Sequence, residues 1–189
     1  MKLLTQKTVK SSINFSGIGL HSGKISNISL KPSEPNSGIV FKRTDLKINN
    51  IVLPNFSNVN NTVLNTTISN EYGVKVSTIE HLMGALFGLG VDNVLIEIDS
   101  EEVPILDGSA KEFIDKILLS GLEKSEAPIK IIKINKKVIY SDNEKFISIE
   151  PSKLSLDIDF ELRYKNNIIG NQQNKINVYE DDLTDIYNS

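Results

Sequence analysis

The chain has 189 residues, of which 39% are hydrophobic and 24% charged, the composition of an ordinary globular protein. This length suits one large domain, or one small domain together with part of another. The formal net charge of −3 argues against nucleic-acid binding, which needs a basic face. The absence of cysteine excludes a disulfide framework, a thiolate metal site and a cysteine nucleophile.

Neither an export signal nor a membrane span is evident. The N-terminal stretch MKLLTQKTVKSS has too short an apolar run for a signal peptide. No window approaches the ~18 apolar residues that a membrane-spanning helix needs. The sequence therefore predicts a cytoplasmic protein.

Strand patterns come first along the chain. Branched and aromatic residues between Gly, Pro, Ser and Asn predict strands over residues 5–15, 24–31 and 38–43. Residues 63–69 and 74–77 are expected to pair across the turn sequence NEYG that separates them.

Two helices and a further strand follow. The first helix is predicted within KVSTIEHLMGALFGLG, residues 75–90, and the next strand over residues 91–98. The second helix is predicted over residues 110–119. Gly121 comes directly after it, as is typical of a C-terminal cap.

The remainder of the chain is strand-rich. The stretch EKSEAP, residues 123–128, is typical of a connector between domains, and strand patterns resume over residues 129–140, 145–150, 154–164 and 175–179. We predict a first α+β domain over residues 1–125 and the opening strands of a second, incomplete domain over residues 129–189. The unpaired edges of an incomplete sheet predict that the isolated chain aggregates.

The pair Glu80–His81 stands at the start of the first predicted helix. Ser77 followed three residues later by Glu80 fits a capping box, in which each side chain binds a backbone N–H. Ser109 and Glu112 repeat the pattern at the second helix, where we expect capping alone. On these residues alone, a helix-capping role and a catalytic role for Glu80 are equally well supported.

The first helix is predicted to have two different faces. Its core stripe consists of apolar residues at helical spacing, namely Ile79, Leu82, Met83 and Leu86. The opposite side consists of His81 followed by small residues, namely Gly84, Ala85 and Gly88. A solvent-facing helix normally carries charges there, and glycine weakens a helix interior. This side therefore predicts close approach by another domain, a strand or a ligand.

His81 is a candidate metal ligand, although no complete zinc site is evident. A catalytic zinc needs three protein ligands and an open position, and neither HExxH nor its inverted form occurs. His21 stands in GIGLHSG, residues 17–23, whose glycines miss the dinucleotide-loop spacing. We interpret this segment as a turn, with His21 structural rather than a ligand. Asp107, in VPILDGSA, is most simply a turn residue and otherwise a catalytic candidate.

Five motifs together resemble one family. They are GIGLHSGK (17–24), FKRTDL (41–46), STIEHLMGAL (77–86), GVDNVLIEI (90–98) and PILDGSA (104–110). They occur in the order found in the UDP-3-O-acyl-N-acetylglucosamine deacetylases, which perform the committed step of lipid A synthesis in Gram-negative bacteria. The chain is identified as resembling the N-terminal portion of this family.

The resemblance implies a fold and an activity. The fold is two similar α+β domains, each a two-layer sandwich of sheet and helices (ribosomal protein S5 domain 2-like), with the active site between them. The activity is a zinc-dependent amide hydrolysis of UDP-3-O-acyl-N-acetylglucosamine. The resemblance further implies a monomer that acts on this substrate, with no nucleic acid partner and no transmembrane segment. The small-residue side beside His81 would then be approached by the second domain and the substrate.

The resemblance also implies roles for individual residues. The family motif S-T-[VI]-E-H maps a zinc ligand onto His81 and a general base onto Glu80. The base takes a proton from the water that attacks the acetamide carbonyl, and zinc polarises that carbonyl. Leu64 and Thr66 match the stretch that lines the family's site beside the metal, so we expect them to contact the substrate.

The chain departs from the family in its second half. The family's other zinc ligands lie on an H-K-x-x-x-D helix of the second domain, and a further histidine there acts as general acid. No histidine follows His81 in this chain, and Asn166–Asn167 replace the family's His-Pro pair. We expect a fragment of a complete deacetylase, inactive alone and supplying one ligand to Zn²⁺. The alternative is a natural short relative that binds a sugar nucleotide or a partner without catalysis.

Overall fold

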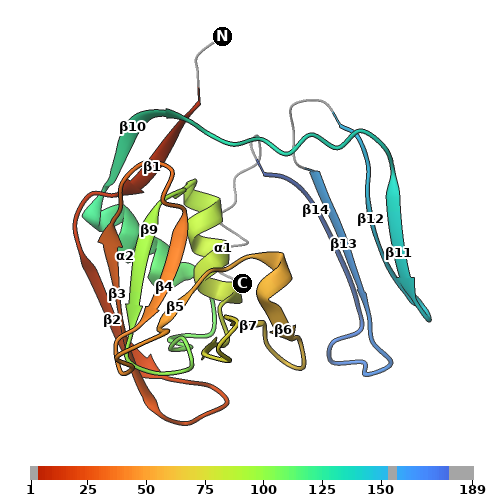
Figure 1. Ribbon diagram of the computed structural model, residues 1–189. Helices are drawn as coiled ribbons and strands as arrows, with labels where there is room; N and C mark the ends of the chain where they lie inside the picture. Colours follow the sequence, from red (N-terminus) through yellow and green to blue (C-terminus); the bar gives the residue numbers. More distant parts are fainter. Residues whose placement is uncertain (1–3, 153–156, 179–189) are drawn as a thin grey trace. The chain divides into compact units, whose positions relative to one another are not determined.

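The computed structural model describes residues 4–152 and 157–178 of the chain. The described residues divide into two compact units, with the division after Ile129. The first unit contains helices and sheets, and the second contains hairpins (Figure 1). The α+β class predicted from the sequence is confirmed.

A five-stranded sheet forms one layer of the first unit. Its order is β2 (Ile13–Ile18), β3 (Ile25–Pro32), β9 (Val94–Ile98), β4 (Ile39–Arg43) and β5 (Ile51–Val52). Neighbouring strands are antiparallel except for β4 and β9, which are parallel. The predicted strands over residues 24–31 and 38–43 are confirmed. The strand predicted over residues 91–98 begins three residues later, at Val94.

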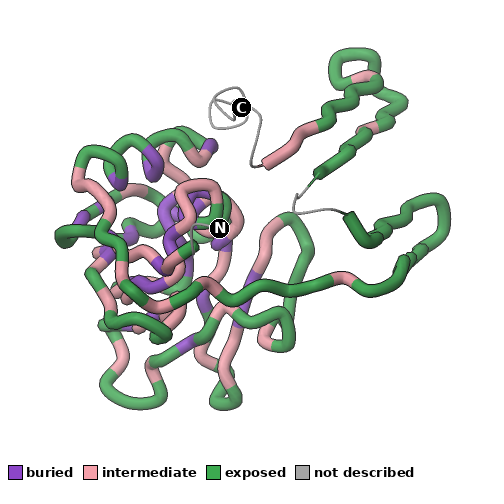
Figure 2. The backbone as a smooth tube through the Cα atoms, turned by 90° about the horizontal axis from the view of Figure 1, so that it is seen from above, coloured by how far each residue is buried: buried purple, intermediate pink, exposed green. Residues whose placement is uncertain are grey.

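Two helices cover one face of this sheet (Figure 1): α1 (Glu80–Leu89) and α2 (Lys111–Ser120). Their apolar residues join the inward residues of the strands in one hydrophobic core, which accounts for most of the buried stretches drawn in purple in Figure 2. Phe15 of β2 and Phe113 of α2 lie with their ring centroids 5.0 Å apart. The C-terminal cap predicted at Gly121 is confirmed, because its N–H binds carbonyls of the last turn and its φ is 85°.

The other face of the sheet is polar. Glu97 of β9 contacts Lys31 of β3 at 2.6 Å and Lys42 of β4 at 3.3 Å, so one carboxylate bridges three neighbouring strands. The period-two alternation of β9 places buried residues toward the helices and half-buried ones on this face. The first unit is therefore a two-layer sheet/helix sandwich.

A ribbon of two antiparallel strands, β1 (Thr5–Val9) and β10 (Leu122–Pro128), pairs the beginning of the first unit with its end. Residues 123–128, predicted as a connector, are therefore part of a strand. Their charged residues are all exposed, a common property of edge strands, and this makes them resemble a linker. The single strand predicted over residues 5–15 is two strands, because the chain bends between β1 and β2.

A small three-stranded sheet consists of β6 (Val59–Asn61), β7 (Thr67–Ser69) and β8 (Lys75–Val76), preceded by a 3-10 turn, η1 (Phe56–Asn58). The pairing predicted between residues 63–69 and 74–77 is confirmed, with Ile68 opposite Val76. The turn is closed by the side chain of Asn70, whose Oδ1 accepts the N–H groups of Tyr72 and Val74.

The second unit contains two hairpins, each described by itself. β11 (Val138–Asp142) pairs with β12 (Lys145–Ile149), and β13 (Asp157–Arg163) pairs with β14 (Asn171–Asn177). Of the predicted strands, 145–150 is confirmed, 129–140 begins only at Val138, and 175–179 begins already at Asn171. Residues 154–156 and 179 of the predicted strands lie outside the described residues. Most residues of the two hairpins are exposed (Figure 2).

Across the described residues, none of the helices is both long enough and apolar enough to pass through a membrane.

Candidate active site

The segment that leads into α1 does not form the predicted capping box. Helix α1 begins at Glu80 after Ile79, and its start has no side-chain cap. The Ser77 hydroxyl instead donates to the Glu101 carbonyl at 3.1 Å. Ser77 is held in an extended backbone that bridges to Glu102, so it lies too far before the first helical turn to cap it. The prediction of a capping box at Ser77 and Glu80 is therefore wrong.

The Glu80 carboxylate is oriented by the neighbouring small sheet. Its Oε2 accepts the backbone N–H of Thr66 at 3.0 Å. The backbone N–H of Ile79 in turn donates to the Thr66 carbonyl at 3.4 Å. No other group of the described residues binds the Glu80 carboxylate, so Oε1 is left for another partner. One oxygen is thus fixed and one is available, which is the arrangement that a positioned general base requires.

His81 follows Glu80 in the first turn of α1 and is half-buried. Its imidazole makes no hydrogen bond and no ion pair with the described part of the chain. A histidine in a folded core normally finds a hydrogen-bond partner. The free imidazole beside a carboxylate is therefore available to a ligand, a metal ion or another part of the protein.

The small-residue side of α1 is not continuous. Ala85 is fully buried in the core, whereas Gly84 is exposed, and a Cβ built on Gly84 meets nothing within 4 Å among the described residues. An α-helix turns by about 100° per residue, which places Ala85 nearer to Leu82 than Gly84 is. The predicted face of His81, Gly84 and Ala85 is therefore split, and nothing in the described chain approaches Gly84 closely.

Buried Glu102 connects the loop between β2 and β3 to the beginning of α1. Its Oε1 accepts the N–H of His21 and the hydroxyl of Thr78, both at 2.9 Å, and its Oε2 accepts the N–H of Ser22 at 2.8 Å. Burial by itself raises the pKa of the Glu102 carboxyl, but the hydrogen bonds from His21, Ser22 and Thr78 hold that pKa below its ordinary value. Glu102 is therefore a buried carboxylate without a cationic partner in the described chain.

The other predicted candidates are spread over the first unit. His21 is exposed and binds Glu102 only through its backbone N–H. Asp107 is exposed in the turn before α2, and its carboxylate accepts the N–H and hydroxyl of Ser109. The Ser109 N–H is the main cause that lowers the pKa of Asp107. Its predicted role as a turn residue agrees with these contacts.

Leu64 and Thr66, predicted to contact substrate, lie in the segment before β7. Thr66 is half-buried and binds Glu80 as described above. The Leu64 side chain is 86% exposed, and its backbone has a φ of 61°, which is rare for a bulky residue. The structure thus brings Thr66 to Glu80 and leaves Leu64 projecting from the same segment.

The cap predicted at the second helix has a different form. Ser109 Oγ accepts the N–H of Lys111, two residues on, and Ala110 precedes the first helical residue. The box predicted for Ser109 and Glu112 is therefore wrong in detail, although Ser109 does satisfy a backbone donor at the start of α2.

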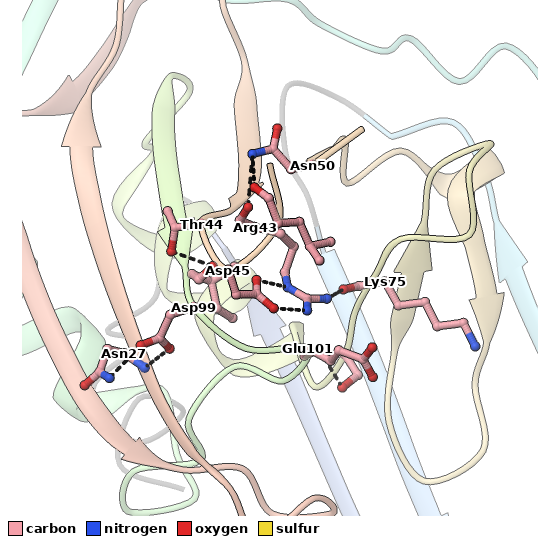
Figure 3. Close-up of polar contacts among 11 residues, drawn as sticks. Asn27, Arg43, Thr44, Asp45, Asn50, Lys75, Asp99 and Glu101 are labelled. Carbon is pink, nitrogen blue, oxygen red and sulfur yellow. Dashed lines mark hydrogen bonds and ion pairs between the residues drawn. The ribbon is translucent and has the colours of Figure 1, made fainter. Parts of the chain in front are cut away.

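Arg43 of the FKRTDL segment has a structural role (Figure 3). Its guanidinium is almost fully buried, donates to both carboxylate oxygens of Asp45 at 2.8 and 2.6 Å, and donates to the Lys75 carbonyl at 2.8 Å. This ties β4 of the large sheet to β8 of the small sheet. The Arg43 guanidinium lowers the pKa of the Asp45 carboxyl. The two sheets are thereby held together.

We expect Asp45→Asn to lower the free energy of unfolding at pH 7 by roughly 0.5–1 kcal/mol, the usual value for a partly exposed ion pair. The Asp45 pKa is depressed in the folded state, so the stabilisation is present above the unfolded value of 3.8 and is lost as pH falls through the folded pKa. Urea unfolding at pH 7 and pH 3 measures the difference between the variant and wild type. A difference of equal size at both pH values would contradict this prediction.

A polar hollow of about 350 Å³ lies on the small sheet, lined by Asn60, Asn61, Asn65, Thr67, Lys75, Ser77 and Glu101. A larger one, of about 500 Å³, lies between the β1–β10 ribbon and the segment after β3. Glu80 and His81 line neither hollow. Among the described residues no group of three or more His, Cys, Asp or Glu side chains is arranged to hold a metal ion.

Comparison with known proteins gives this site its context. A sequence model of the UDP-3-O-acyl N-acetylglycosamine deacetylases matches residues 6–188. The chain belongs to this deacetylase family. The resemblance predicted from the five motifs is therefore confirmed.

Curated deacetylases from several bacteria share about two residues in five with this chain. The UDP-3-O-acyl-N-acetylglucosamine deacetylase of Pasteurella multocida (strain Pm70) is 43% identical over 162 residues, which are 84% of this chain and 53% of that protein. That of Haemophilus influenzae (strain PittEE) is 42% identical over 162 residues, which are again 84% of this chain and 53% of that protein. That of Nautilia profundicola is 42% identical over 174 residues, which are 92% of this chain and 58% of that protein. The chain thus spans about half the length of the curated deacetylases it matches.

Sequence reasoning missed the part that Glu102 plays in this deacetylase chain. Glu102 stands in DSEEV, which reads as an exposed acidic turn, and nothing distinguishes it from the exposed Glu101. The one available signal was the apolar sequence VPIL directly after it, which indicates that the chain is entering the core at this point. Burial of a carboxylate depends on donors from Ser22 and Thr78, which are remote in sequence.

Proposed function

We propose that this chain is part of an enzyme that removes the acetyl group of UDP-3-O-acyl-N-acetylglucosamine, the committed step of lipid A synthesis. Glu80 is the general base and His81 is one ligand of a zinc ion. Membership of the deacetylase family supports the reaction class. The observation that carries the assignment is the oriented Glu80 carboxylate, with Oε2 bound to Thr66 and Oε1 available, next to an unbound imidazole.

The described residues do not fit a complete zinc site. A catalytic zinc has three protein ligands and an open position, and the described residues offer His81 without two further ligands near it. His21 and Asp107 belong to no such group either, and the Asp107 carboxylate accepts the N–H of Ser109. A zinc ion in this enzyme therefore needs ligands other than those that the described residues supply.

Glu80 provides the proton transfer. Amide hydrolysis requires a water to lose a proton as it attacks the acetamide carbonyl, and the leaving amine to gain one. The Glu80 carboxylate accepts the first proton on Oε1, while Thr66 keeps Oε2 in place. Thr66 binds the carboxylate, Leu64 lies two residues earlier in the same segment, and both are proposed to contact the substrate. The cytoplasmic location and the monomeric state remain predictions from the sequence.

The 189-residue chain is expected to show no deacetylase turnover by itself, because one histidine does not hold a catalytic metal. Acetate release from the UDP-acyl-GlcNAc substrate is measured with added Zn²⁺, and a complete curated relative serves as the positive control. Turnover that is present in the chain and lost in His81→Ala would contradict this expectation.

Sequencing the coding DNA past the codon for Ser189 tests the wider proposal. A reading frame that continues into an H-K-x-x-x-D helix and a later histidine supports a complete deacetylase. A stop codon there favours the alternative of a binding protein, which calorimetry distinguishes. A binding protein takes up the UDP-sugar equally with and without a metal chelator.

A further inference from the structure

We propose that Glu102 is a positioning residue of this site: its buried carboxylate holds the Thr78 turn that presents Glu80 and His81. This proposal rests on the function proposed above for those two residues. Glu102 contacts neither of them directly and acts through Thr78.

Glu102 is a costly group to bury. Its side chain is 2% exposed, and no cation pairs with it among the described residues. An unpaired buried carboxylate costs several kcal/mol unless hydrogen bonds replace its hydration. Here the donors are two consecutive backbone N–H groups, of His21 and Ser22, and the Thr78 hydroxyl. The Glu102 carboxylate therefore ties Thr78 to the backbone of the loop between β2 and β3.

Thr78 is the strained point of the segment that leads into α1. It has a φ of 54°, a left-handed conformation that β-branched residues adopt rarely and only under strain. Its side chain is buried, and its hydroxyl binds Glu102 at 2.9 Å. Such a conformation persists only where the surroundings hold it. Here the chain turns from the extended Ser77 into the helix that begins at Glu80.

The helix start is held from two sides. On one side the N–H of Ile79 and the carboxylate of Glu80 both bind the backbone of Thr66. On the other side Thr78 binds Glu102, whose neighbours Glu101 and Val103 bond to the backbone of Ser77. If the Glu102 contact is lost, the strained turn can relax, and the Glu80 carboxylate moves relative to Thr66. A displacement of about 1 Å in a catalytic group costs up to 10²-fold in rate.

Two substitutions at Thr78 separate positioning from general stability. Thr78→Val keeps the branched shape and removes the hydroxyl that binds Glu102, whereas Thr78→Ser keeps the hydroxyl. The first readout is the amide of Thr66 in the ¹⁵N-labelled complete deacetylase that contains this chain. We expect its proton shift and its hydrogen exchange to change in Thr78→Val, in the direction seen in Glu80→Ala, and to remain near wild type in Thr78→Ser. The amide of Asn27, which binds the Asp99 carboxylate at 2.8 Å, is the control and stays unchanged.

The second readout is the rate of the complete deacetylase that contains this chain. We expect kcat to fall about 10-fold or more in Thr78→Val with little change in KM, and to recover in Thr78→Ser. Glu102→Gln should behave like Thr78→Val, since the amide group repels one of the N–H donors. If the Glu102→Gln variant does not fold, the two Thr78 variants still test whether Glu102 positions the helix start. A Thr66 amide that is unchanged in Thr78→Val would overturn the proposal.

The two proposals fail in different ways. If Glu80→Gln keeps its activity, Glu80 is not the base and the function proposed above is wrong, while the Thr66 amide still reports whether Glu102 positions the helix start. If Glu80→Gln is inactive and Thr78→Val retains both full kcat and the wild-type Thr66 amide, the function stands and the positioning role is overturned.

Discussion

Glu80→Gln is expected to lower kcat/KM of the complete deacetylase that contains this chain by about 10²–10⁴-fold, the usual contribution of a positioned general base. Glutamine has the same shape, and its amide oxygen can keep the hydrogen bond from the Thr66 N–H. It cannot accept a proton from the attacking water. The fold and the substrate affinity should therefore change little while the rate collapses. Steady-state kinetics with the UDP-acyl-GlcNAc substrate and circular dichroism of the variant measure both.

Two further variants make this result specific. Glu71→Gln changes an exposed glutamate in the turn between β7 and β8 and should leave the rate at the wild-type value. His81→Ala should lower the amount of bound zinc as well as the rate, whereas Glu80→Gln should keep its zinc, because the two residues have different roles. A Glu80→Gln enzyme with more than a tenth of the wild-type rate would exclude Glu80 as the base.

The fold was predictable where local pattern and tertiary environment agree. Alternating apolar residues located β3 and β4, and the Asn70 turn located the β7–β8 pair, because turn chemistry acts over a few residues. Residues 123–128 were misread, since a charged edge strand and a linker have similar composition. The pattern carries no information on β1, the remote partner that makes this stretch a strand.

The candidate site was predictable only in part. The pair Glu80–His81 was identified through the family motif, and the residues alone left helix capping as an equal possibility. Capping is wrong because Thr66 binds the Glu80 carboxylate from 14 positions earlier in the chain. Glu102 was not identified, since burial of a charge is decided by donors brought together in three dimensions. The local strain at Thr78 likewise has no signature in the sequence.

Gly19→Ala is expected to destabilise the chain by about 2–4 kcal/mol, as overpacking and the displacement of a buried carboxylate together do. Gly19 has room for no side chain. A Cβ there would clash with the Oε2 of Glu102 and the Oγ of Ser22, and would lie 2.8 Å from the Glu102 Cδ. Its backbone is not in the left-handed region, so the constraint is close approach rather than torsion. The carboxylate would have to leave the position in which it binds Ser22 and Thr78.

Gly84→Ala is the matched control for this substitution and should have the opposite sign. Gly84 lies inside α1, and an added Cβ meets nothing within 4 Å in the described part of the chain. Alanine then favours the helix over glycine by about 0.5–1 kcal/mol. Urea unfolding of both variants, followed by circular dichroism, compares an alanine that displaces Glu102 with one that meets no neighbouring described residue. Equal stability of the two variants would mean that Glu102 adapts at no cost, and its carboxylate would then be too loosely held to fix the beginning of α1.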